Sequence, residues 1–516
     1  MAEPFYITTA INYPNGPPHV GHAYEAICTD AIARFQRLQG RDVFFLTGTD
    51  EHGLKMAQAA RERGIEPPAL ADEMSSYFRE MDAQLNISFD RFIRTSEPAH
   101  HEASRELWRR MAAKGDIYLG RYEGWYSVRD EAYYDEDELV VADTGEKFSP
   151  QGTPVEWTVE ESWFFRLSAY QDRLLAYYEA NPDFIRPESR RNEVLRFVEG
   201  GLSDLSISRT SFDWGVKVPE SEDHVMYVWL DALTNYLTGI GFPDTNSESY
   251  KKFWPADLHI IGKDVVRFHA VYWPAFLMSA ELPLPKQVFG HGHVLLRGEK
   301  MSKSVGNVVS PQELVDAFGV DAVRYFLIRD VSFGQDGSYS PEAIVTRVNA
   351  DLANSFGNLA QRTLSFIVKN LEGRLPRGEA DQGLLATVRE ALGVEMRDHF
   401  GTLALSQGVE AWIRAVFACN QYIDAEAPWA LRKTDPERME AVLATLVQAI
   451  RMLAIAIQPV VPGAAGRLLD QLGVPADQRD WRHLEDDSLY ARLQSEDFRL
   501  APPQALFPRM EAPAQG

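Results

Sequence analysis

Apolar and polar positions follow two different periods in the first part of the chain. Residues 5–11 (FYITTAI) and 42–48 (DVFFLTG) are short apolar runs, which are typical of buried strands. Residues 23–39 carry apolar side chains at intervals of three and four, and this spacing predicts a helix with one buried face. A further helix is expected near residues 66–85. Strand, helix and strand in this order predict a parallel, doubly wound α/β sheet of the Rossmann-like kind.

The pattern changes over residues 115–210 and then returns. This stretch, which includes YEGWYSVRDEAYYDEDELVVADTGEKFSP, is rich in aromatic and turn residues and predicts small antiparallel elements. Strand and helix patterns resume over residues 211–295, for example in HVMYVWLDAL. We therefore expect a connective insertion at 115–210 that divides a catalytic α/β domain into a first half, residues 1–114, and a second half, residues 211–295.

The last third of the chain has the helical period throughout. Val348, Leu352 and Phe356 follow one another at steps of four, and amphipathic segments continue to about residue 470. We expect residues 346–516 to form a separate all-α bundle, with about the last dozen residues as a loose tail.

The composition is that of an ordinary globular protein. Of the 516 residues 45% are hydrophobic and 25% are charged, and this length predicts several domains. The formal net charge of −23 argues against a general nucleic-acid coat, but it leaves room for a local basic surface that binds one folded RNA. Cys28 and Cys419 lie in helical patterns, which excludes a disulfide scaffold and a thiolate zinc site and fits a reducing cytoplasm.

The sequence predicts no membrane association. Its first residues, MAEPFYITT, lack the basic region and the long apolar core of a secretion signal. The most apolar later stretch, AVLATLVQAIRMLAIAIQPVVPG, contains Gln448 and Arg451, so it is expected to be a buried helix. A cytoplasmic location follows from these observations.

Candidate chemistry begins in the loop YPNGPPHVGH, between the first strand and the first helix. His19 and His22 lie three apart in the first helical turn, where free backbone N–H groups and the helix dipole favour a phosphate. Gly21 would let a nucleotide ring approach the backbone, and Asn15 and Gly16 suit the sharp turn before it. A short motif of this kind is also compatible with two surface caps.

A second motif, KMSKS, occupies residues 300–304 within a connecting region at 296–345. Lys300 and Lys303 lie three apart between glycine-containing flanks, which predicts a loop. Flexible lysines there suit the pyrophosphate leaving group of a nucleotide, on which charge builds up as the bond breaks. A solvated lysine loop is the alternative for this motif when it is taken alone.

The two motifs on an α/β frame resemble the class I aminoacyl-tRNA synthetases, whose signatures are HIGH and KMSKS. Other segments are similar to the methionyl-tRNA synthetases within that class. These segments are YITTAINYPNGPPHVGHAYE, TGTDEHGLKM, YVWLDAL, HIIGKDVVRFHAVYWPA and NLAQR. The resemblance runs from the N-terminus to about residue 460.

The resemblance implies two reaction steps. L-Methionine and ATP, which brings Mg²⁺, give methionyl-adenylate and pyrophosphate, and methionine then passes to the 3′ end of tRNA(Met), including the initiator tRNA. Little protein nucleophile chemistry is needed, so rate would come from positioning and charge stabilisation. By resemblance the catalytic residues are His19, His22, Lys300 and Lys303. The implied ATP-binding residues are Asn15, Gly16, His19, Gly21, His22, Lys300, Met301, Ser302, Lys303 and Ser304.

The resemblance also marks a methionine site. Asp50 in TGTDEHG would pair with the substrate ammonium group, the alternative being a strand-end cap. An apolar and aromatic pocket suits the polarisable sulfur, although Trp229 or Val265 alone would sooner be taken for core residues. Asp231 is either structural or orients Tyr13. The implied pocket residues are Ala10, Ile11, Tyr13, Trp229, Ala232, Leu233, Tyr236, Val265 and His269.

The helical bundle would read the anticodon. Asn358 and Arg362 in NLAQR lie four apart and therefore on one helix face. Trp429 could stack on an unpaired base, which is how single-stranded RNA is usually read. A solvated polar pair and a half-buried aromatic are the alternatives.

The sequence departs from many members of the family in its insertion, where they hold zinc through paired cysteines. Ser127 and Asp130 stand at the first pair of ligand positions, and Phe148 and Gln151 at the second. This set cannot make a tetrahedral structural site, so we predict no structural zinc. Aromatic packing is expected to hold the insertion together instead, through Trp125, Tyr133, Tyr134 and Trp157.

The insertion is too short for the editing domain of the leucine, isoleucine and valine enzymes. A monomer is expected because the chain stops soon after the bundle.

Three other functions share parts of this pattern. Another class I synthetase or related ligase is one alternative. A small adenylyl or cytidylyl transferase shares the His-x-Gly-His element but is usually much shorter. A catalytically dead RNA-binding relative is the third, and the intact His19, His22, Lys300 and Lys303 weigh against it.

Overall fold

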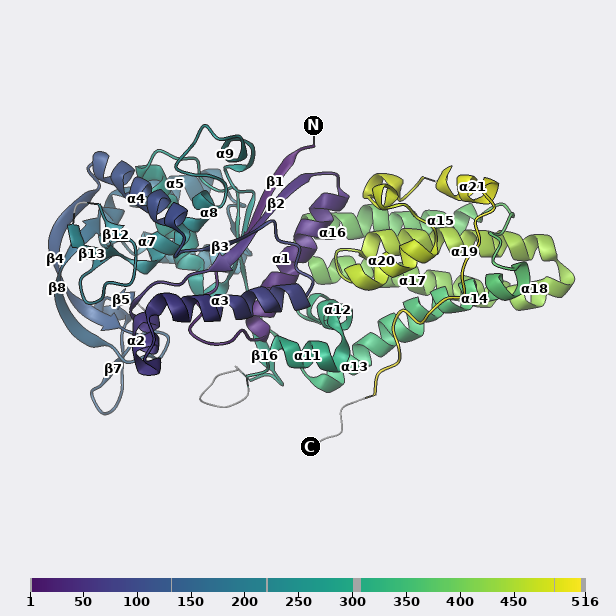
Figure 1. Ribbon diagram of the computed structural model, residues 1–516, viewed down its shortest axis with the longest axis horizontal. Helices are drawn as coiled ribbons and strands as arrows, with labels where there is room; N and C mark the ends of the chain where they lie inside the picture. Colours follow the sequence, from purple (N-terminus) through teal and green to yellow (C-terminus); the bar gives the residue numbers. More distant parts are fainter. Residues whose placement is uncertain (1, 131, 220, 300–307, 487, 512–516) are drawn as a thin grey trace.

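The computed structural model describes residues 2–130, 132–219, 221–299, 308–486 and 488–511. The molecule is elongated (Figure 1), with the α/β part at one end and a helical bundle at the other. The described part of the KMSKS region lies between them, at the lower edge of the view. The α/β part and the helical bundle can therefore each carry a functional site, and the fold determines how the two parts are joined.

The main sheet has six strands, all parallel, in the order β3-β2-β1-β14-β15-β9. This confirms the predicted doubly wound sheet. The chain order reverses between β1 and β14, and ligands of open α/β sheets bind at such a switch point. The strands are β1 (Pro4–Thr9), β2 (Asp42–Thr49), β3 (Arg91–Arg94), β9 (Ile185–Arg186), β14 (Leu258–Gly262) and β15 (Val288–His291).

Side chains of β1 alternate between two hydrophobic cores, because successive residues of a strand face opposite sides of the sheet. Phe5 and Ile7 belong to a core that includes the first helix and continues into the bundle. Tyr6 belongs to a second core on the other face. The helices of the α/β part are α1 (Val20–Leu38), α2 (Leu54–Arg63), α3 (Pro67–Gln84), α4 (Pro98–Ala113), α7 (Val228–Leu233), α8 (Asn235–Thr238), α9 (Glu248–Phe253) and α10 (Trp273–Ser279).

The segment 115–210 forms an antiparallel sheet in the order β10-β8-β4-β5, built on a long β4·β8 pair. One of its strands, β9, instead joins the main sheet beside β15. The segment is therefore woven into the catalytic sheet at one point. Its elements are β4 (Ile117–Ser127), β5 (Ala132–Tyr134), β6 (Val140–Val141), β7 (Lys147–Phe148), β8 (Glu156–Phe165), α5 (Gln171–Ala180), α6 (Glu188–Glu199) and β10 (Leu205–Ser206).

Short elements connect the parts. A three-stranded antiparallel sheet in the order β11-β13-β12 precedes α7, and β16 pairs with β17 beyond the main sheet. These elements are β11 (Ser208–Arg209), β12 (Lys217–Val218), β13 (Ser221–Met226), β16 (Val294–Leu296), α11 (Pro311–Phe318), α12 (Val320–Asp330), β17 (Gly337–Tyr339) and α13 (Pro341–Val348).

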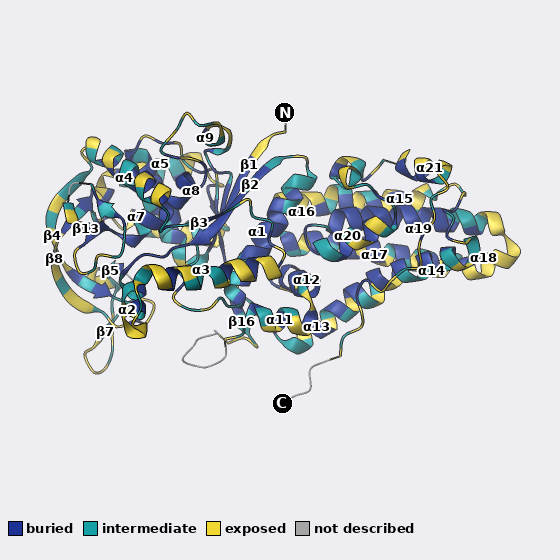
Figure 2. Cartoon of the chain, viewed as in Figure 1, coloured by how far each residue is buried: buried dark blue, intermediate teal, exposed yellow. Residues whose placement is uncertain are grey.

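The bundle packs around α19 (Pro436–Ile457). This helix is long and apolar enough to cross a membrane by length and composition alone, but 89% of its most apolar window is buried. Figure 2 shows it dark blue at the centre of the bundle, while the outer end near α18 is largely exposed. The remaining helices are α14 (Asn358–Leu371), α15 (Gln382–Arg389), α16 (Arg397–Gly401), α17 (Leu405–Glu426), α18 (Pro428–Thr434), α20 (Pro462–Gln471) and α21 (Ser488–Ser495).

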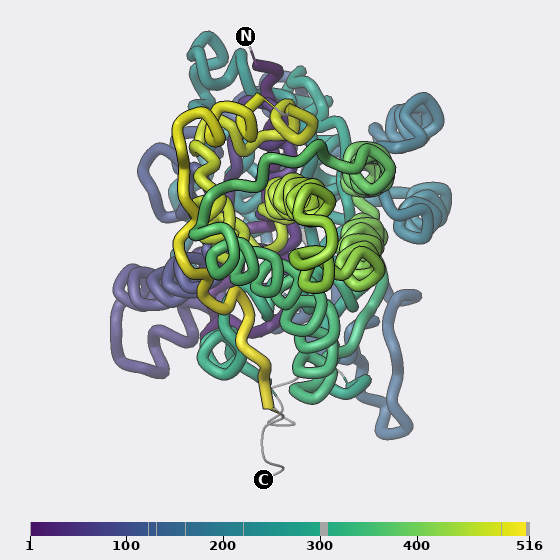
Figure 3. Tube along the Cα trace, turned by 90° about the vertical axis from the view of Figure 1, so that its right-hand side faces the viewer, coloured from purple at the N-terminus to yellow at the C-terminus, as the bar shows by residue number. Residues whose placement is uncertain are grey.

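The described part of the C-terminal tail is packed rather than loose, in contrast to the expectation from the sequence. Phe507 is buried, and Met510 exchanges backbone hydrogen bonds with the Asn349 side chain at 2.9 Å. The end-on view shows this yellow segment running back along the green helices (Figure 3). Its apolar side chains, spaced too irregularly to predict an element, are buried by tertiary contacts.

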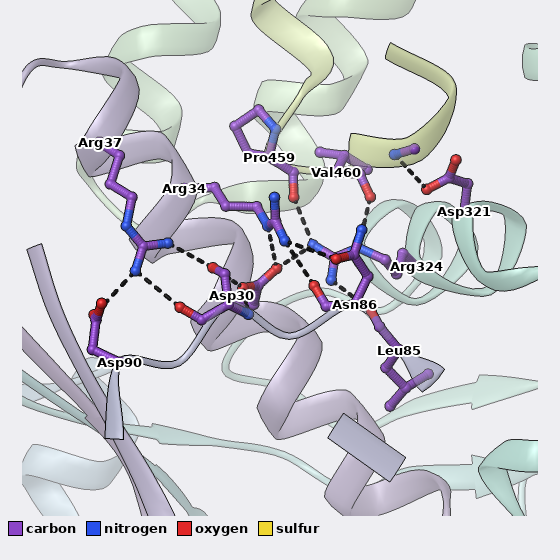
Figure 4. A network of polar contacts seen from close by, with 12 residues as sticks. Asp30, Arg34, Arg37, Leu85, Asn86, Asp90, Asp321, Arg324, Pro459 and Val460 are labelled. Carbon is purple, nitrogen blue, oxygen red and sulfur yellow. Dashed lines mark hydrogen bonds and ion pairs between the residues drawn. The ribbon is translucent and has the colours of Figure 1, made fainter. Parts of the chain in front are cut away.

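A buried ion pair joins the catalytic helix α1 to the bundle (Figure 4). The Arg324 guanidinium on α12 donates to Asp30 of α1 at 2.6 Å, and both side chains are fully buried. Arg324 also donates to the carbonyls of Pro459 and Val460, in the turn between α19 and α20, at 2.9 and 3.0 Å. One side chain therefore ties three elements together at the junction of the two parts.

Candidate active site

His19 and His22 lie at the N-terminus of α1, as predicted. Their rings lie close together, with centroids 3.8 Å apart and planes tilted by 31°. A Cβ on Gly21 would lie 2.9 Å from the His19 ring, so only glycine allows this close approach. The two imidazoles therefore sit together at the end of α1 that carries its free N–H groups and the positive end of its dipole.

A capping box fixes the hydrogen bonds of both rings. His19 Nδ1 accepts the Gly21 N–H at 3.0 Å, and His22 Nδ1 accepts the His19 N–H at 3.1 Å. A neutral imidazole carries one proton, so each ring holds it on Nε2. Both side chains are thus prepared to act as hydrogen-bond donors through Nε2.

One cavity of about 500 Å³ opens beside these histidines, at the switch point of the sheet. It contains every side chain that the sequence assigned to methionine, and the walls come from β1 and β2 ends, α7, α8 and the segment before α10. Of the predicted residues it is lined by Ala10, Ile11, Tyr13, His19, Gly21, His22, Asp50, Trp229, Ala232, Leu233, Tyr236, Val265 and His269.

A hydrogen-bond chain determines the protonation of the pocket imidazole. His269 Nδ1 lies 2.9 Å from the Val265 carbonyl, which can only accept, so this nitrogen carries the proton. Tyr236 then donates its hydroxyl proton to His269 Nε2 at 2.6 Å. Burial lowers the pKa of His269 to about 4, so the ring is neutral near pH 7. Its π-helical turn, Phe268–Tyr272, brings the ring to the cavity.

Aromatic stacking holds the apolar walls. Trp229 lies flat on Phe268, with ring centroids 3.8 Å apart and planes within 7°. Tyr236 stacks on the buried His259 at 4.1 Å. Asp50, at the end of β2, is buried and its backbone N–H donates to the Asn12 carbonyl at 2.8 Å. The cavity thus combines one carboxylate with rigid aromatic walls.

Asn15 and Gly16 are not among the residues that line the cavity. Asn15 is exposed, and its backbone N–H closes a tight turn on the Tyr13 carbonyl at 2.9 Å. Their role in this structure is therefore to shape the loop. The other predicted ATP residues, Lys300, Met301, Ser302, Lys303 and Ser304, lie outside the described residues.

Polar residues that the sequence analysis missed also line the cavity, among them Glu25, Asp264, His291 and His293. Glu25, one turn after His22, accepts the Ala10 N–H at 2.9 Å and pairs with His291 Nε2 at 2.7 Å. Asp264 pairs with His293 Nε2 at 2.7 Å. The sequence GHGHV, which begins in the last residues of β15, is the signal that could have located the two histidines.

In the insertion, two of the four positions assigned to zinc ligands, Ser127 and Asp130, belong to a hydrogen-bonded cluster. Ser149 and Thr153 contact the Asp130 carboxylate, and Ser127 bonds Thr153 at 2.7 Å. Ser149 and Thr153 therefore occupy the place that the sequence analysis gave to Phe148 and Gln151. No group of three or more His, Cys, Asp or Glu side chains that could hold a metal occurs among the described residues.

Aromatic contacts accompany this cluster. Trp125 and Trp157 meet edge to face with centroids 5.3 Å apart, while Tyr133 packs on Tyr126 at 4.7 Å. The Tyr134 hydroxyl donates to Asp130 at 3.0 Å. Polar and aromatic contacts thus both hold the insertion.

The bundle brings together two of the predicted anticodon residues. The Arg362 guanidinium on α14 lies 5.3 Å from the Trp429 ring centroid and pairs with Asp424 at 2.7 Å. Trp429, on α18, is 46% exposed, so its ring is accessible from solvent. Asn358 is exposed at the start of α14, one turn before Arg362.

Comparison with known proteins decides between the functions that the sequence left open. Residues 5–364 match the family model described as tRNA synthetases class I (M). The chain belongs to the methionyl-tRNA synthetase family. Residues 375–515 match the anticodon binding domain of methionyl tRNA ligase. The family joins methionine to tRNA, which confirms the function that the sequence motifs predicted and excludes a short nucleotidyl transferase.

Full-length relatives agree with this family. The Methionine--tRNA ligases of Mycobacterium tuberculosis (strain ATCC 25618 / H37Rv) and Rhizobium meliloti (strain 1021) are 58% and 57% identical, and each alignment covers 99% of both chains. A solved M. tuberculosis methionyl-tRNA synthetase in complex with methionyl-adenylate has a TM-score of 0.93 at 57% identity, over 98% of this chain and 100% of that one. The free form of that enzyme has a TM-score of 0.88 at 53% identity, over 99% of both chains.

Proposed function

We propose that methionine activation takes place in the cavity beside α1, with the amino acid at the α7 wall and the phosphates of ATP at the histidines. The observation that carries this proposal is the convergence of the Asp50 carboxylate, the aromatic walls and the two α1 histidines on one cavity. A substrate that spans it would place its ammonium at Asp50 and its carboxylate toward α1. That arrangement brings two reactants together at small entropic cost.

The apolar end of the cavity suits a thioether. Trp229, stacked on Phe268, and Tyr236, stacked on His259, form walls that cannot close inward without losing these contacts. The Tyr236 hydroxyl donates its hydrogen bond to His269, so the apolar end of the pocket offers little to an ionised side chain. Charged amino acids would lose solvation there without gaining a partner.

In the first step a methionine carboxylate oxygen attacks the α-phosphorus of ATP, and the bond to pyrophosphate breaks. Negative charge moves onto the phosphate oxygens as this happens. His19 and His22 donate their Nε2 protons as hydrogen bonds to these oxygens, and the N-terminus of α1 adds its dipole. Mg²⁺ enters with ATP as part of the substrate. Lys300 and Lys303, outside the described residues, would hold the departing pyrophosphate.

In the second step the terminal adenosine hydroxyl of tRNA(Met) takes the methionyl group and AMP leaves. Trp429 and Arg362 in the bundle would stack on and pair with anticodon bases. Elongator and initiator tRNA share that anticodon and would both be substrates. The enzyme would work as a monomer in the cytoplasm. It would need no structural zinc, because the side chains of the Asp130 cluster are hydrogen-bonded to one another.

Exchange of labelled pyrophosphate into ATP tests the site assignment. Asp50→Asn should raise the KM for methionine about tenfold or more, because a hydrogen bond to a charged group contributes roughly 1.5–3 kcal/mol. The KM for ATP should stay near the parent value. Glu62→Gln, which neutralises an exposed carboxylate on α2, is the matched control and should change neither constant. A methionine KM that is unchanged in Asp50→Asn would refute the assignment.

A further inference from the structure

Asp231 lies within the pocket helix α7 but does not line the cavity. Its side chain is fully buried, and each carboxylate oxygen accepts a hydrogen bond from a different histidine. His52 Nδ1 is 2.6 Å from Oδ2, and His100 Nε2 is 2.7 Å from Oδ1. The two imidazoles hold the pKa of Asp231 well below its usual range, so it is ionised and its hydrogen bonds are of the strong, charge-assisted kind.

His52 belongs to the segment that presents Asp50. Its ring meets the Trp214 ring edge to face at 4.9 Å and the His101 ring at 5.2 Å, so its orientation is fixed. Trp214 also donates its indole N–H to the Glu51 carbonyl at 2.6 Å, and its own carbonyl accepts the Gly53 N–H at 3.2 Å. The backbone on both sides of His52 is therefore anchored.

The His52–Asp231 bond joins two walls of the cavity that are 179 positions apart in the chain. One wall carries Asp50, two residues before His52. The other carries Trp229 and Ala232, which flank Asp231 on α7. Glu51, between Asp50 and His52, is bound in a different direction by Arg94 at 2.6 Å. The His52–Asp231 pair is thus a direct side-chain bond from this segment to α7.

We propose that His52 and Asp231 are positioning residues, which set the place of the Asp50 carboxylate relative to the α7 wall and thereby the binding of the substrate ammonium. The proposal rests on the function proposed above for Asp50. Amino acids differ in the distance from the ammonium group to the end of the side chain. A fixed spacing between the Asp50 segment and α7 therefore favours amino acids of one length. Neither residue lines the cavity, so they would act through Asp50 and α7.

His100 provides a matched control. It binds the other oxygen of the same carboxylate from α4, and its other nitrogen lies 3.0 Å from Thr238. Removing either imidazole takes one hydrogen bond from Asp231 and leaves a buried charge less well satisfied. Only His52 joins that charge to Asp50. A merely structural role would make the two removals equivalent.

The test measures methionine-dependent pyrophosphate exchange and thermal unfolding for the full chain. His52→Ala should raise the KM for methionine about tenfold, equal to ~1.4 kcal/mol, with the KM for ATP at the parent value. His52→Asn, whose amide N–H stands near the position of Nδ1, should restore most of the loss. His100→Ala should lower the unfolding temperature as His52→Ala does but keep the parent KM for methionine. If His52→Ala does not fold, His52→Gln, with its donor displaced, carries the same test.

A double-mutant cycle separates this proposal from the function on which it rests. In an Asp50→Asn background, His52→Ala should cause no further rise in the methionine KM, since the carboxylate that it positions is gone. An additive rise there, or an equal rise in His100→Ala, overturns the positioning role. A raised KM in Asp50→Asn with a parent KM in His52→Ala overturns that role alone. An unchanged KM in Asp50→Asn overturns the ammonium site and the positioning role together.

Discussion

The catalytic region and the helical bundle use polar side chains in opposite ways. In the catalytic region the side chains that shape the site are buried: Thr8, Glu51, His52, Asp231 and His259 are at most 2% exposed. In the bundle the residues proposed to bind RNA, Arg362 and Trp429, lie on the surface, over an interior that is apolar around α19.

This contrast follows from the two kinds of ligand. A small amino acid must be enclosed, and its charged ends must meet partners that other buried contacts hold in place. Unpaired bases of a large RNA can be read by rings and guanidinium groups displayed on a rigid support. Stability in the bundle therefore comes from apolar packing, and the surface can vary independently of the core. In the catalytic region, positions and stability depend on the same buried bonds.

The largest expected effect is on stability at the Arg324–Asp30 ion pair, because this pair joins the catalytic region to the bundle. Arg324→Met should lower the free energy of unfolding by about 3–5 kcal/mol, since Asp30 would stay buried with its main partner removed. Denaturant titration measures the loss. Arg63→Met, which breaks the exposed pair with Glu73, should cost no more than about 1 kcal/mol. Equal losses in the two variants would contradict the contrast between buried and surface polar bonds.

Removing a histidine from α1 should affect rate more than stability. His22→Ala should lower kcat of pyrophosphate exchange by about 10²–10³, the typical cost of one donor to a transition-state charge. Ser340→Ala is the control, because it removes an N-cap bond from α13 without touching the cavity. It should lose about 1 kcal/mol of stability and keep the parent rate. Similar rates for the two variants would argue that His22 is only a cap.

A surface change in the bundle should affect tRNA alone. Trp429→Ala should lower kcat/KM for charging tRNA(Met) by a factor that corresponds to about 1–3 kcal/mol, the range for one stacked base. Pyrophosphate exchange should stay at the parent value. Phe417, an exposed ring on α17, supplies the control Phe417→Ala, which should charge tRNA normally. Loss of exchange activity in Trp429→Ala would show that the bundle acts on the cavity as well as on RNA.

The smallest expected effect is a pH dependence that comes from the pocket. His269 has a pKa of about 4 in the folded protein against an ordinary value of 6.5, so as pH falls below 6.5 the unfolded chain takes up this proton first. Stability that is present above pH 6.5 is lost as pH falls toward 4, by about 1 kcal/mol between pH 6.5 and 5.5. Denaturant titrations at the two values should show this loss in Tyr236→Phe but less of it in His269→Gln. An equal loss in both variants would assign it to other groups.

The sequence predicted what depends on local pattern. The strands and helices around HVGH follow from hydrophobic period, and the pocket residues were found because the family motifs mark them. Partners that are distant in the chain could not be predicted. The bonds from Asp231 to His52 and from Glu25 to His291 join positions 179 and 266 apart, and no local signal pairs them.

Two smaller differences have similar causes. β9 joins the main sheet although its sequence neighbours form the insertion, because two residues of strand carry too short a pattern to assign. In the loop before β8, Ser149 and Thr153 rather than Phe148 and Gln151 meet Asp130. The geometry of the turn, and not the spacing of residues in the sequence, determines which side chains point inward.

The central claim is that one cavity in the catalytic region selects methionine before any tRNA is bound. Pyrophosphate exchange into ATP, measured without tRNA for each of the twenty amino acids, tests it most directly. The account predicts exchange with methionine alone. Exchange that is equally efficient with leucine or another amino acid, or that requires tRNA, would contradict it.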